Sequence, residues 1–498
     1  MKTKKLAIFL FTLILAIGLL PMNVFAAQRD IAEDSTASIT VNNAVENDVL
    51  AAYKVIDIAY NTTSNHLTYA WNSDFADYFE GKTSFNNTVY TVEQFAALAS
   101  KSPELNALLA QIPNYIANKS IAAVDTQTVA ADGTATFANL SMGEYFIRPT
   151  SSTSVYQLML QKIEPTIVDG KYVIDDVSFT AKKEEVTITK TADKTSVTKN
   201  EKVNYTITAD IPTYAENTTD KSFYISDLLP DGLTIDTTSI TVKIGDTDVD
   251  ASAYTLDTTA TATYTFKLSV DTDKYEAKWS TNGGKQLVIT YSATLNDNDT
   301  TEVNAPETNT VTFDYSYYPY VENSHKQKTD TANVTTFAIK IDKFVSSDEN
   351  TKLAGAKFDL YRTATLEEID TDTAVVIPHT TIKGIKLEGD LVTDDSGVAI
   401  FEKYEANGTN YDYYLVETQA PSGYNILDNS VKVNFSDDDV EATGGIYTVK
   451  VPNSRGIKLP ITGGEGIVLF TIIGIALMGS AVILLMISRR KPKTTEKK

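Results

Sequence analysis

Cysteine and histidine, two residue types on which enzymes often rely, are absent or scarce in this 498-residue chain. The sequence has no cysteine, which excludes disulfides, thioesters and cysteine-bound metals. Its three histidines, His66, His325 and His379, lie far apart and have neither metal-ligand nor catalytic-triad spacing. We therefore expect no enzyme built on histidine, and no cofactor.

Two acidic clusters remain as candidates for a metal site. Residues 437–439 are three aspartates, and residues 296–299 alternate asparagine with aspartate. Both could offer oxygen ligands to calcium, but neither follows the pattern of an EF-hand loop. We predict that both are turns, and we assign no metal to them.

The strongest chemical signal lies near the C-terminus. Leu459-Pro460-Ile461-Thr462-Gly463 precedes an uncharged apolar run over residues 466–487, and a basic cluster follows at 489–491. A membrane-spanning helix needs roughly 20 apolar residues, and basic residues hold its end in the cytoplasm. The pentapeptide resembles the LPxTG sorting signal of Gram-positive surface proteins. The resemblance implies that a sortase cleaves between Thr462 and Gly463; the alternative is an ordinary membrane anchor with a chance pentapeptide.

The N-terminus carries an export signal. Three lysines precede an uncharged stretch over residues 6–20, and Val24-Phe25-Ala26 offers a small-residue cleavage site. We predict a signal peptide over residues 1–26. The mature chain is then secreted and anchored to the cell wall, and its precursor is only transiently in the membrane.

The charge of the chain limits its partners. The formal net charge is −22, and the exported part is more acidic still because the two terminal segments are basic. Such a charge keeps an exposed chain soluble and disfavours nucleic acid or an anionic membrane as a partner.

Short alternating runs of Val, Ile, Thr and Tyr, broken by Asp, Asn and Gly, fill most of the mature chain. Period-two alternation with frequent turn residues predicts an all-β fold of tandem antiparallel, immunoglobulin-like β-sandwiches. One exception is a capping-box signal at residues 91–94, followed by Pro103 at the start of a second helical stretch. We therefore expect a short helical insertion in the first domain.

The length and a weak internal similarity suggest three domains. Residues 132–147 parallel residues 395–415 in a strand-turn-strand pattern. The division that we predict comprises a signal peptide, three domains, the sorting signal, and a transmembrane helix with its basic tail: 1–26, 27–182, 183–335, 336–458, 459–463 and 464–498.

The third domain contains two recognisable segments. Residues 414–424 resemble the E-box of Gram-positive pilins, and residues 353–361 resemble the second strand of the B-type domains of collagen adhesins (CnaB). The resemblance implies an intramolecular isopeptide bond between a first-strand lysine and a last-strand asparagine. The matching residues are Lys340 and Asn453, with Glu417 as the acid, and Lys343 is the competing lysine.

This chemistry needs a buried site. A lysine amine is a nucleophile only when it is neutral, and burial lowers its pKa. A buried carboxyl stays protonated and can donate a hydrogen bond to the asparagine carbonyl. Folding holds amine and amide together, which gives a high effective concentration, and ammonia leaves once per bond.

The middle domain has the same order of residues. Residues 225–233 resemble the strand that carries an aspartate acid in pilin middle domains, and residues 309–313 resemble the last strand. The resemblance implies a bond between Lys190 and Asn309 with Asp227 as the acid. Alternatively, Asp227 only caps a turn before Pro230.

The first domain departs from this scheme. The parallel between residues 145–147 and 413–415 puts Pro149 at the position of Glu417, with Arg148 beside it. Neither side chain can act as a neutral proton donor. We predict no such bond there, unless an acid from another strand serves, and we expect this domain to unfold most easily.

An acceptor lysine would allow subunits to be joined. Residues 173–182 resemble, with several departures, the motif in which backbone pilins end their first domain with an acceptor lysine. The match points to Lys182, with Lys183 as second choice; the alternative is a solvated linker lysine.

Together these resemblances imply a major (backbone) pilin rather than an enzyme. A sortase would join Thr462 to Lys182 of the next subunit, in an open filament because the contact is heterologous. The implied partners are identical subunits, the sortase, ancillary pilins, peptidoglycan and a host surface ligand. The alternatives are a monomeric wall-anchored adhesin and a minor tip or basal pilin.

Overall fold

The computed structural model describes residues 29–30, 35–61, 63, 66–81, 84–85, 88–89, 91–96, 98, 103–169, 171–297, 299–406, 411–441, 443–456 and 465–488. The predicted signal peptide, the pentapeptide 459–463 and the basic cluster 489–491 lie outside these residues.

The described chain is mostly β-strand, which confirms the predicted fold class. By its contacts it divides into two compact units, of which the first ends at Thr336 and the second begins at Phe337. The first unit holds two separate hydrophobic cores and the second unit holds a third large one. Alternation along the strands explains these cores: every second residue of β2, for example, is buried.

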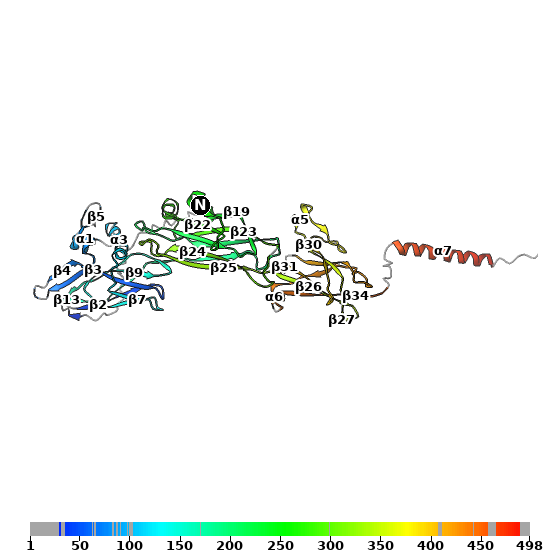
Figure 1. The fold of residues 1–498 in the computed structure, drawn as a ribbon, viewed down its shortest axis with the longest axis horizontal. Helices are drawn as coiled ribbons and strands as arrows, with labels where there is room; N and C mark the ends of the chain where they lie inside the picture. The colour runs from blue at the N-terminus through cyan, green and yellow to red at the C-terminus, as the bar shows by residue number, and fades with distance from the viewer. Residues whose placement is uncertain are drawn as a thin grey trace, which may run out of the picture. The chain divides into compact units, whose positions relative to one another are not determined.

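The first core lies between two sheets (Figure 1). One has the order β14-β2-β8, and the other has the order β11-β9-β3-β4, with β7 also paired to β3. The strands are β2 (Thr36–Asn42), β3 (Val49–Asn61), β4 (His66–Trp71), β7 (Asp125–Thr128), β8 (Ala135–Ser141), β9 (Gly143–Ser151), β11 (Met159–Ile163) and β14 (Val177–Thr180).

A helical insertion lies between β4 and β7, as predicted. It contains α1 (Ala76–Gly81), α2 (Val92–Ala96) and α3 (Pro103–Lys119), with the two-residue strands β5 (Ser84–Phe85) and β6 (Thr88–Val89). The capping box forms: the Thr91 amide donates to Gln94 Oε1 at 2.8 Å, and the Gln94 amide donates to Thr91 Oγ1 at 3.3 Å. Proline opens α3, where its missing amide hydrogen costs nothing.

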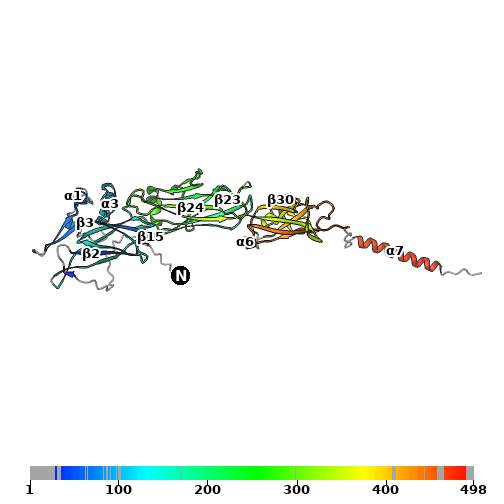
Figure 2. The same cartoon turned by 60° about the horizontal axis from the view of Figure 1, so that its bottom comes forward.

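The second core lies between two five-stranded sheets, whose long strands run alongside one another in both views (Figure 1, Figure 2). The first has the order β16-β17-β23-β19-β20: β16 (Ile188–Ala192), β17 (Lys202–Asp210), β19 (Leu233–Ile244), β20 (Thr247–Asp248) and β23 (Gln286–Leu295). The second has the order β21-β22-β18-β24-β25: β18 (Phe223–Leu228), β21 (Thr255–Asp257), β22 (Phe266–Val270), β24 (Glu307–Ser316) and β25 (His325–Val334). Short helical turns connect β20 to β21 and β22 to β23: η1 (Ala251–Ala253), α4 (Thr272–Lys274), η2 (Tyr275–Trp279) and η3 (Ser280–Asn282).

The two cores of the first unit interleave along the chain. Val155 belongs to the second core, whereas its neighbour Tyr156 belongs to the first, and Tyr318 and Tyr320 return to the first core after β24. Small sheets lie around this region: β10 (Ser154–Tyr156) with β15 (Lys183–Glu185), and β1 (Arg29–Asp30) with β13 (Lys171–Ile174) and β12 (Thr166–Val168). The predicted boundary near residue 183 therefore stays a prediction.

The second unit is a sandwich of two further sheets. In one, β26 (Phe337–Val345) pairs with β27 (Asp348–Lys352), β31 (Val398–Tyr404) and, in parallel, β34 (Ile446–Asn453). The other has the order β29-β30-β28-β32-β33: β28 (Lys357–Thr363), β29 (Val375–Val376), β30 (Lys383–Val392), β32 (Tyr413–Gln419) and β33 (Val431–Val433). Two short helices are α5 (Leu366–Asp370) and α6 (Asp437–Glu441).

A last helix, α7 (Glu465–Ser488), occupies the predicted apolar run. Among the residues that the structure describes, no helix meets the length and apolarity that crossing a membrane requires. The prediction of a spanning helix over residues 466–487 therefore has no support from the structure and depends on the sequence alone.

Candidate functional site

The first-strand lysine of the second unit that faces the core is Lys343. Along β26 the side chains of Phe337, Ile339, Ile341 and Lys343 are all buried. Successive residues of a strand point to opposite faces, so Lys343, which is two residues after Ile341, points to the same core face as these apolar residues.

Lys343 meets the predicted acid and asparagine in a dry cluster. Its Nζ donates to Asn453 Oδ1 and lies 3.1 Å from Glu417 Oε1. The three residues come from β26, β34 and β32, and each is at most 2% exposed. Burial lowers the pKa of the Lys343 amine, and the charge of Glu417 opposes that shift.

The prediction that Lys340 is the reacting lysine is therefore wrong in its geometry. Lys340 lies three residues before Lys343 on the same strand, so its side chain leaves the opposite face, where it is half-buried. The signal that identifies Lys343 is the alternation 337-339-341-343 of apolar residues ending in lysine.

Glu417 accepts a hydrogen bond from the side-chain amide nitrogen of Asn453. Asn453 Nδ2 donates to Glu417 Oε1 at 2.9 Å and to the Asn425 carbonyl at 2.9 Å. The Leu427 amide donates to Glu417 Oε2 at 2.7 Å. We expected the acid to contact the amide oxygen instead; here the oxygen faces the lysine and the nitrogen faces the acid.

A second cluster lies in the second core, that of the predicted middle domain, and contains all three residues predicted for that domain. Lys190 comes from β16 of one sheet, whereas Asp227 and Asn309 come from β18 and β24 of the facing sheet. Lys190 Nζ donates to Asp227 Oδ2, and both side chains are fully buried. Asp227 therefore lies inside the sandwich, and the alternative that it only caps an exposed turn is wrong.

Burial shifts both charged groups toward neutrality. It lowers the pKa of Lys190 to about 8, against the attraction of Asp227, and it raises the pKa of Asp227 against the attraction of Lys190. The rings of Tyr205 and Tyr291 line the amine, with centroids 5.3 and 5.2 Å from Lys190 Nζ.

Sequence reasoning missed Tyr291 of β23, which lies at the centre of this cluster. Lys190 Nζ donates to its hydroxyl at 2.8 Å, and Asn309 Nδ2 donates to the same oxygen at 2.6 Å. The hydroxyl in turn donates to Asp227 Oδ1 at 2.9 Å. A tyrosine on the core face of a strand usually needs a partner for its hydroxyl, and that was the available signal.

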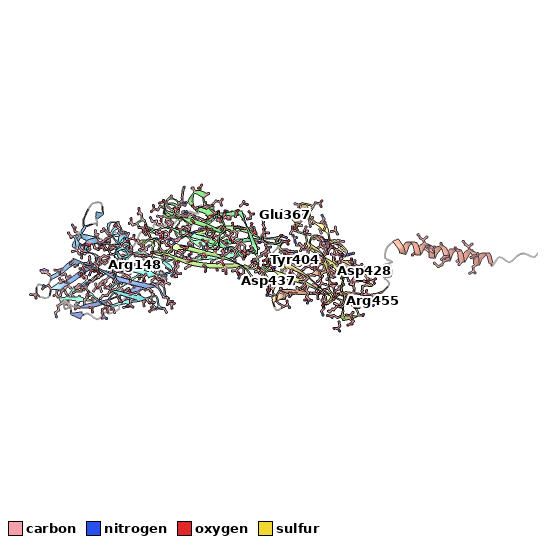
Figure 3. All side chains as sticks on the ribbon, in the orientation of Figure 1. Arg148, Glu367, Tyr404, Asp428, Asp437 and Arg455 are labelled. Atoms are coloured by element: carbon pink, nitrogen blue, oxygen red, sulfur yellow. The ribbon has the colours of Figure 1, made fainter. Side chains whose placement is uncertain are left out.

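The first domain also contains two buried acids, Asp48 and Glu144. Asp48 Oδ2 accepts hydrogen bonds from Ser152 Oγ and Tyr156 OH, each at 2.7 Å. Burial raises the pKa of Glu144 to about 7. Arg148, labelled in Figure 3, lies 5.6 Å from the centre of the Tyr53 ring. The absence of an internal bond in this domain stays a prediction.

The two candidate acceptor lysines lie between β14 and the start of β15. Lys182 is half-buried, and its carbonyl accepts from the Gln157 amide at 3.0 Å. Lys183 Nζ lies 3.1 Å from Glu185 Oε1, and its side chain is 13% exposed. The choice between Lys182 and Lys183 stays a prediction.

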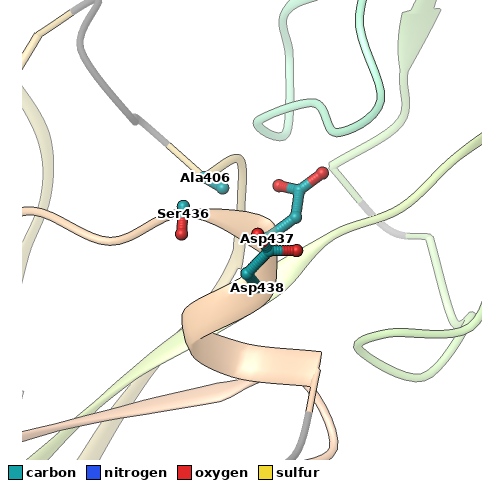
Figure 4. Close-up of a pocket in the computed structure, with 4 residues that line it drawn as sticks. All are labelled: Ala406, Ser436, Asp437 and Asp438. Carbon is teal, nitrogen blue, oxygen red and sulfur yellow. The ribbon is translucent and has the colours of Figure 1, made fainter.

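The prediction of a turn is wrong for residues 437–439, which open the short helix α6, whereas the Asp299 amide donates to the Asn296 carbonyl at 3.2 Å in a turn. At the start of α6, Ser436 donates through its amide and its hydroxyl to Asp439 Oδ2, at 2.7 and 2.8 Å. Asp437 and Asp438 line an open surface hollow with Ala406 and Ser436 (Figure 4). In the other cluster, Asn296 Oδ1 accepts from Thr234 Oγ1 at 2.7 Å; Asn298 lies outside the described residues.

The described residues contain no group of three or more His, Asp or Glu side chains that could hold a metal ion. His325 instead forms a charged cluster, with Nδ1 against Asp314 and Nε2 3.1 Å from Asp220 Oδ2. Burial lowers its pKa, but the hydrogen bonds and charges of the two aspartates outweigh burial and raise that pKa to about 9.

Two known families match consecutive segments in the C-terminal part of the chain. Residues 337–447 match the prealbumin-like fold domain of the SpaA family, and residues 451–493 match the LPXTG cell wall anchor motif. The fold and the anchor motif define a surface protein attached to the cell wall.

Solved structures place the chain among known folds. The T6 backbone pilin of Streptococcus pyogenes is 19% identical, with 82% of this chain and 81% of that chain covered and a TM-score of 0.58. For the major pilins SpaD and SpaA of Corynebacterium diphtheriae, identities are 15% and 18% and TM-scores 0.54 and 0.52; they cover 86% and 84% of this chain and 99% and 100% of theirs. The chain therefore has the fold of Gram-positive major pilins.

One curated relative matches over part of the sequence. Fimbrial subunit type 1 of Actinomyces viscosus is 26% identical in an alignment 245 residues long, which covers 43% of this chain and 45% of that protein. The chain thus matches less than half the length of this relative.

Proposed function

We propose that this protein is the backbone subunit of a covalently joined surface pilus, strengthened by two internal isopeptide bonds. The observation that carries the proposal is the pair of dry clusters, each with a lysine, an acid and an asparagine at the required place in a sandwich. The anchor motif, the pilin fold and the fimbrial relative support it. The structure of SpaA points to a modular pilus assembly stabilizing isopeptide bonds, which is the chemistry that we assign here.

The reaction in the second unit is an amide exchange. The neutral Lys343 amine attacks Asn453 Cγ, so that the Nζ–Cγ bond forms and the Cγ–Nδ2 bond breaks. One proton passes from the lysine nitrogen to the leaving nitrogen through Glu417, which touches both. Ammonia departs, and no other reactant is needed. In this proposal the chain catalyses only its own crosslinking.

The location of the bonds gives them a mechanical purpose. Lys343 and Asn453 lie on neighbouring parallel strands, β26 and β34, near the beginning and the end of the second unit. Lys190 and Asn309 join β16 to β24 across the middle sandwich. Forced unfolding is limited by the rate at which strands separate, and a covalent bond between two strands blocks that step. In the second unit the bond joins the first strand to the last; in the middle sandwich β25 follows β24, so Asn309 lies on the last strand but one and not, as predicted, on the last.

The anchor motif and the pilin fold support a sortase-catalysed joining of subunits as part of this proposal. A sortase cuts between Thr462 and Gly463 and transfers Thr462 to Lys182 of the next subunit, with Lys183 as second choice. The last subunit is transferred to peptidoglycan, and ancillary pilins and a host ligand are the remaining proposed partners. The same surface protein without subunit joining would be a monomeric adhesin.

The mass of the intact mature chain tests the internal bonds. Two bonds remove the mass of two ammonia molecules from the value calculated from the sequence. A mass equal to the plain sequence would refute both bonds. Peptide mapping of assembled material then tests the joining: a Thr462–Lys182 or Thr462–Lys183 peptide supports the pilin, and its absence from the surface protein supports the adhesin.

A further inference from the structure

We propose that Tyr291 is a catalytic residue of the middle cluster, where its hydroxyl relays a proton from Asp227 to the leaving nitrogen of Asn309. This inference rests on the proposed isopeptide chemistry and adds a participant to it. The hydroxyl oxygen touches three groups within 2.6–2.9 Å: the attacking nitrogen of Lys190, the leaving nitrogen of Asn309 and the carboxyl of Asp227.

The acid of this cluster does not contact the amide directly. Among the described residues, no hydrogen bond joins Asp227 to Asn309, whereas both groups bind the Tyr291 hydroxyl. In the second unit Glu417 touches Asn453 Nδ2 itself, at 2.9 Å. The tyrosine hydroxyl therefore occupies the position that the longer glutamate carboxyl fills in the other cluster.

The amide orientation also directs the proton to nitrogen. Asn309 is fully buried, and its Oδ1 makes no hydrogen bond within the described part of the chain. The amide nitrogen is the atom that the hydroxyl reaches. Loss of ammonia requires a proton at that nitrogen, because an amide anion is a very poor leaving group.

The tyrosine is suited to a relay because it stays neutral. Burial raises its pKa well above the usual value, with Asp227 adding to the shift, so the hydroxyl keeps its proton. A neutral hydroxyl donates and accepts at once. Tyr205 stacks on Tyr291 with ring centroids 5.4 Å apart, which holds the phenol in place.

The steps balance without any added reactant. The neutral Lys190 amine attacks Asn309 Cγ and forms the Nζ–Cγ bond. Asp227 begins protonated, so for this step the hydroxyl accepts from Asp227 and donates to Nδ2, the reverse of the two hydrogen bonds seen in the structure: Tyr291 gives its proton to Nδ2 as the Cγ–Nδ2 bond breaks, and Asp227 gives its proton to the phenolate. The lysine nitrogen, now an amide, gives up one proton to Asp227, and ammonia leaves.

Tyr291→Phe tests the relay in the full chain, because phenylalanine keeps the ring and removes only the hydroxyl. We expect the Lys190–Asn309 crosslink to form on the order of a hundredfold more slowly, as measured by mass spectrometry of peptides during folding. The Lys343–Asn453 crosslink in the same molecules is the internal control, and it should form at the wild-type rate. Crosslinking of Lys190 at the wild-type rate in this variant would overturn the relay.

Tyr205→Phe is the matched control from the same stacked pair. The Tyr205 hydroxyl lies beside Asn309, but among the described residues no hydrogen bond joins it to Asp227 or Lys190, so its removal should slow the middle crosslink less than removal of the Tyr291 hydroxyl does. An equal slowing in both variants would assign the effect to ring packing and contradict the relay. Asp227→Asn should lose the crosslink by itself, and adding Tyr291→Phe should slow it no further.

A site-specific difluorotyrosine at position 291 covers the case in which Tyr291→Phe fails to fold. It has nearly the same shape and a more acidic phenol, so the pH profile of the middle crosslink should shift while that of the second unit does not. An unshifted profile overturns the relay. If wild-type chain lacks the Lys190–Asn309 crosslink, the proposed middle-domain bond itself fails, which is a different result.

Discussion

The middle cluster and the cluster of the second unit arrange the same three kinds of residue in different ways. Around Lys343 the acid touches amine and amide together, and the ring of Phe358 lies 5.4 Å from the amine. Around Lys190 the acid touches only the amine, and a tyrosine hydroxyl connects it to the amide.

The difference follows from the length of the acid and the sheet from which it comes. Glutamate has one more methylene than aspartate, and Glu417 reaches Asn453 from β32 of the facing sheet. Asp227 lies two strand positions from Asn309 across the β18–β24 pair, since its register partner is Val311. Neighbouring strands bring the backbones close, but the short carboxyl needs Tyr291 to complete the connection.

Glu417→Ala should have the largest effect on the comparison. It removes the acid from the second unit, so we expect that bond alone to be lost: the mature chain should be lighter than the mass calculated for the variant sequence by one ammonia instead of two. The unreacted Lys343 then stays buried without its partner, which costs about 3–5 kcal/mol in unfolding free energy. Intact mass and thermal unfolding measure both effects.

The exposed Glu402 on β31 offers a matched control, because Glu402→Ala removes an equal side chain from the surface of the same unit. It should leave the unfolding temperature and the deficit of two ammonia molecules, relative to the mass calculated for its sequence, unchanged. A deficit of two ammonia molecules in Glu417→Ala would show that Glu417 is not the acid.

Lys343→Met should also abolish the second-unit bond, with a smaller loss of stability than Glu417→Ala. Methionine fills the apolar space, and the carboxyl keeps its hydrogen bonds from Asn453 and Leu427. Lys340→Met on the opposite face should retain the full loss of ammonia. Peptide mapping distinguishes the two lysines, and a crosslink from Lys340 to Asn453 would reverse the assignment.

His325 predicts a smaller, pH-dependent difference between the two regions. Its folded-state pKa of about 9 lies above the roughly 6.5 of an unfolded histidine. The charged ring therefore stabilises the middle sandwich fully below about pH 6.5, and this contribution is lost as pH rises through about 9. The contribution is about 2 kcal/mol after allowance for partial exposure.

Urea unfolding of wild type and His325→Gln at about pH 6 and pH 10 measures this difference. The variant should be less stable at the lower pH and equal to wild type at the higher pH. His379→Gln is the control in the second unit, because His379 is exposed. A constant gap between wild type and His325→Gln at both pH values would contradict the assignment.

The sequence allowed much of this architecture to be predicted. Alternating Val, Ile, Thr and Tyr residues predicted the β-sandwich fold, and Thr91 and Gln94 predicted the capping box of α2. Asp227, Asn309, Glu417 and Asn453 were found because each lies in a motif that can be read along one strand. The lysine of the second unit was misassigned because the motif identifies the strand on which the lysine lies but not the face of that strand. The alternation of buried residues along β26 decides which lysine points into the core.

What the sequence by itself determined is local: the order of the strands, the acidic charge, the anchor motif and the types of residue available for crosslinking. The tertiary structure decided which residues meet. Lys343 and Asn453 are 110 positions apart, and Tyr291 joins residues from two facing sheets. Such contacts depend on strand register and sheet packing. A shift of one residue moves a side chain by about 3.3 Å along its strand and turns it to the opposite face of the sheet, which separates it from its partner.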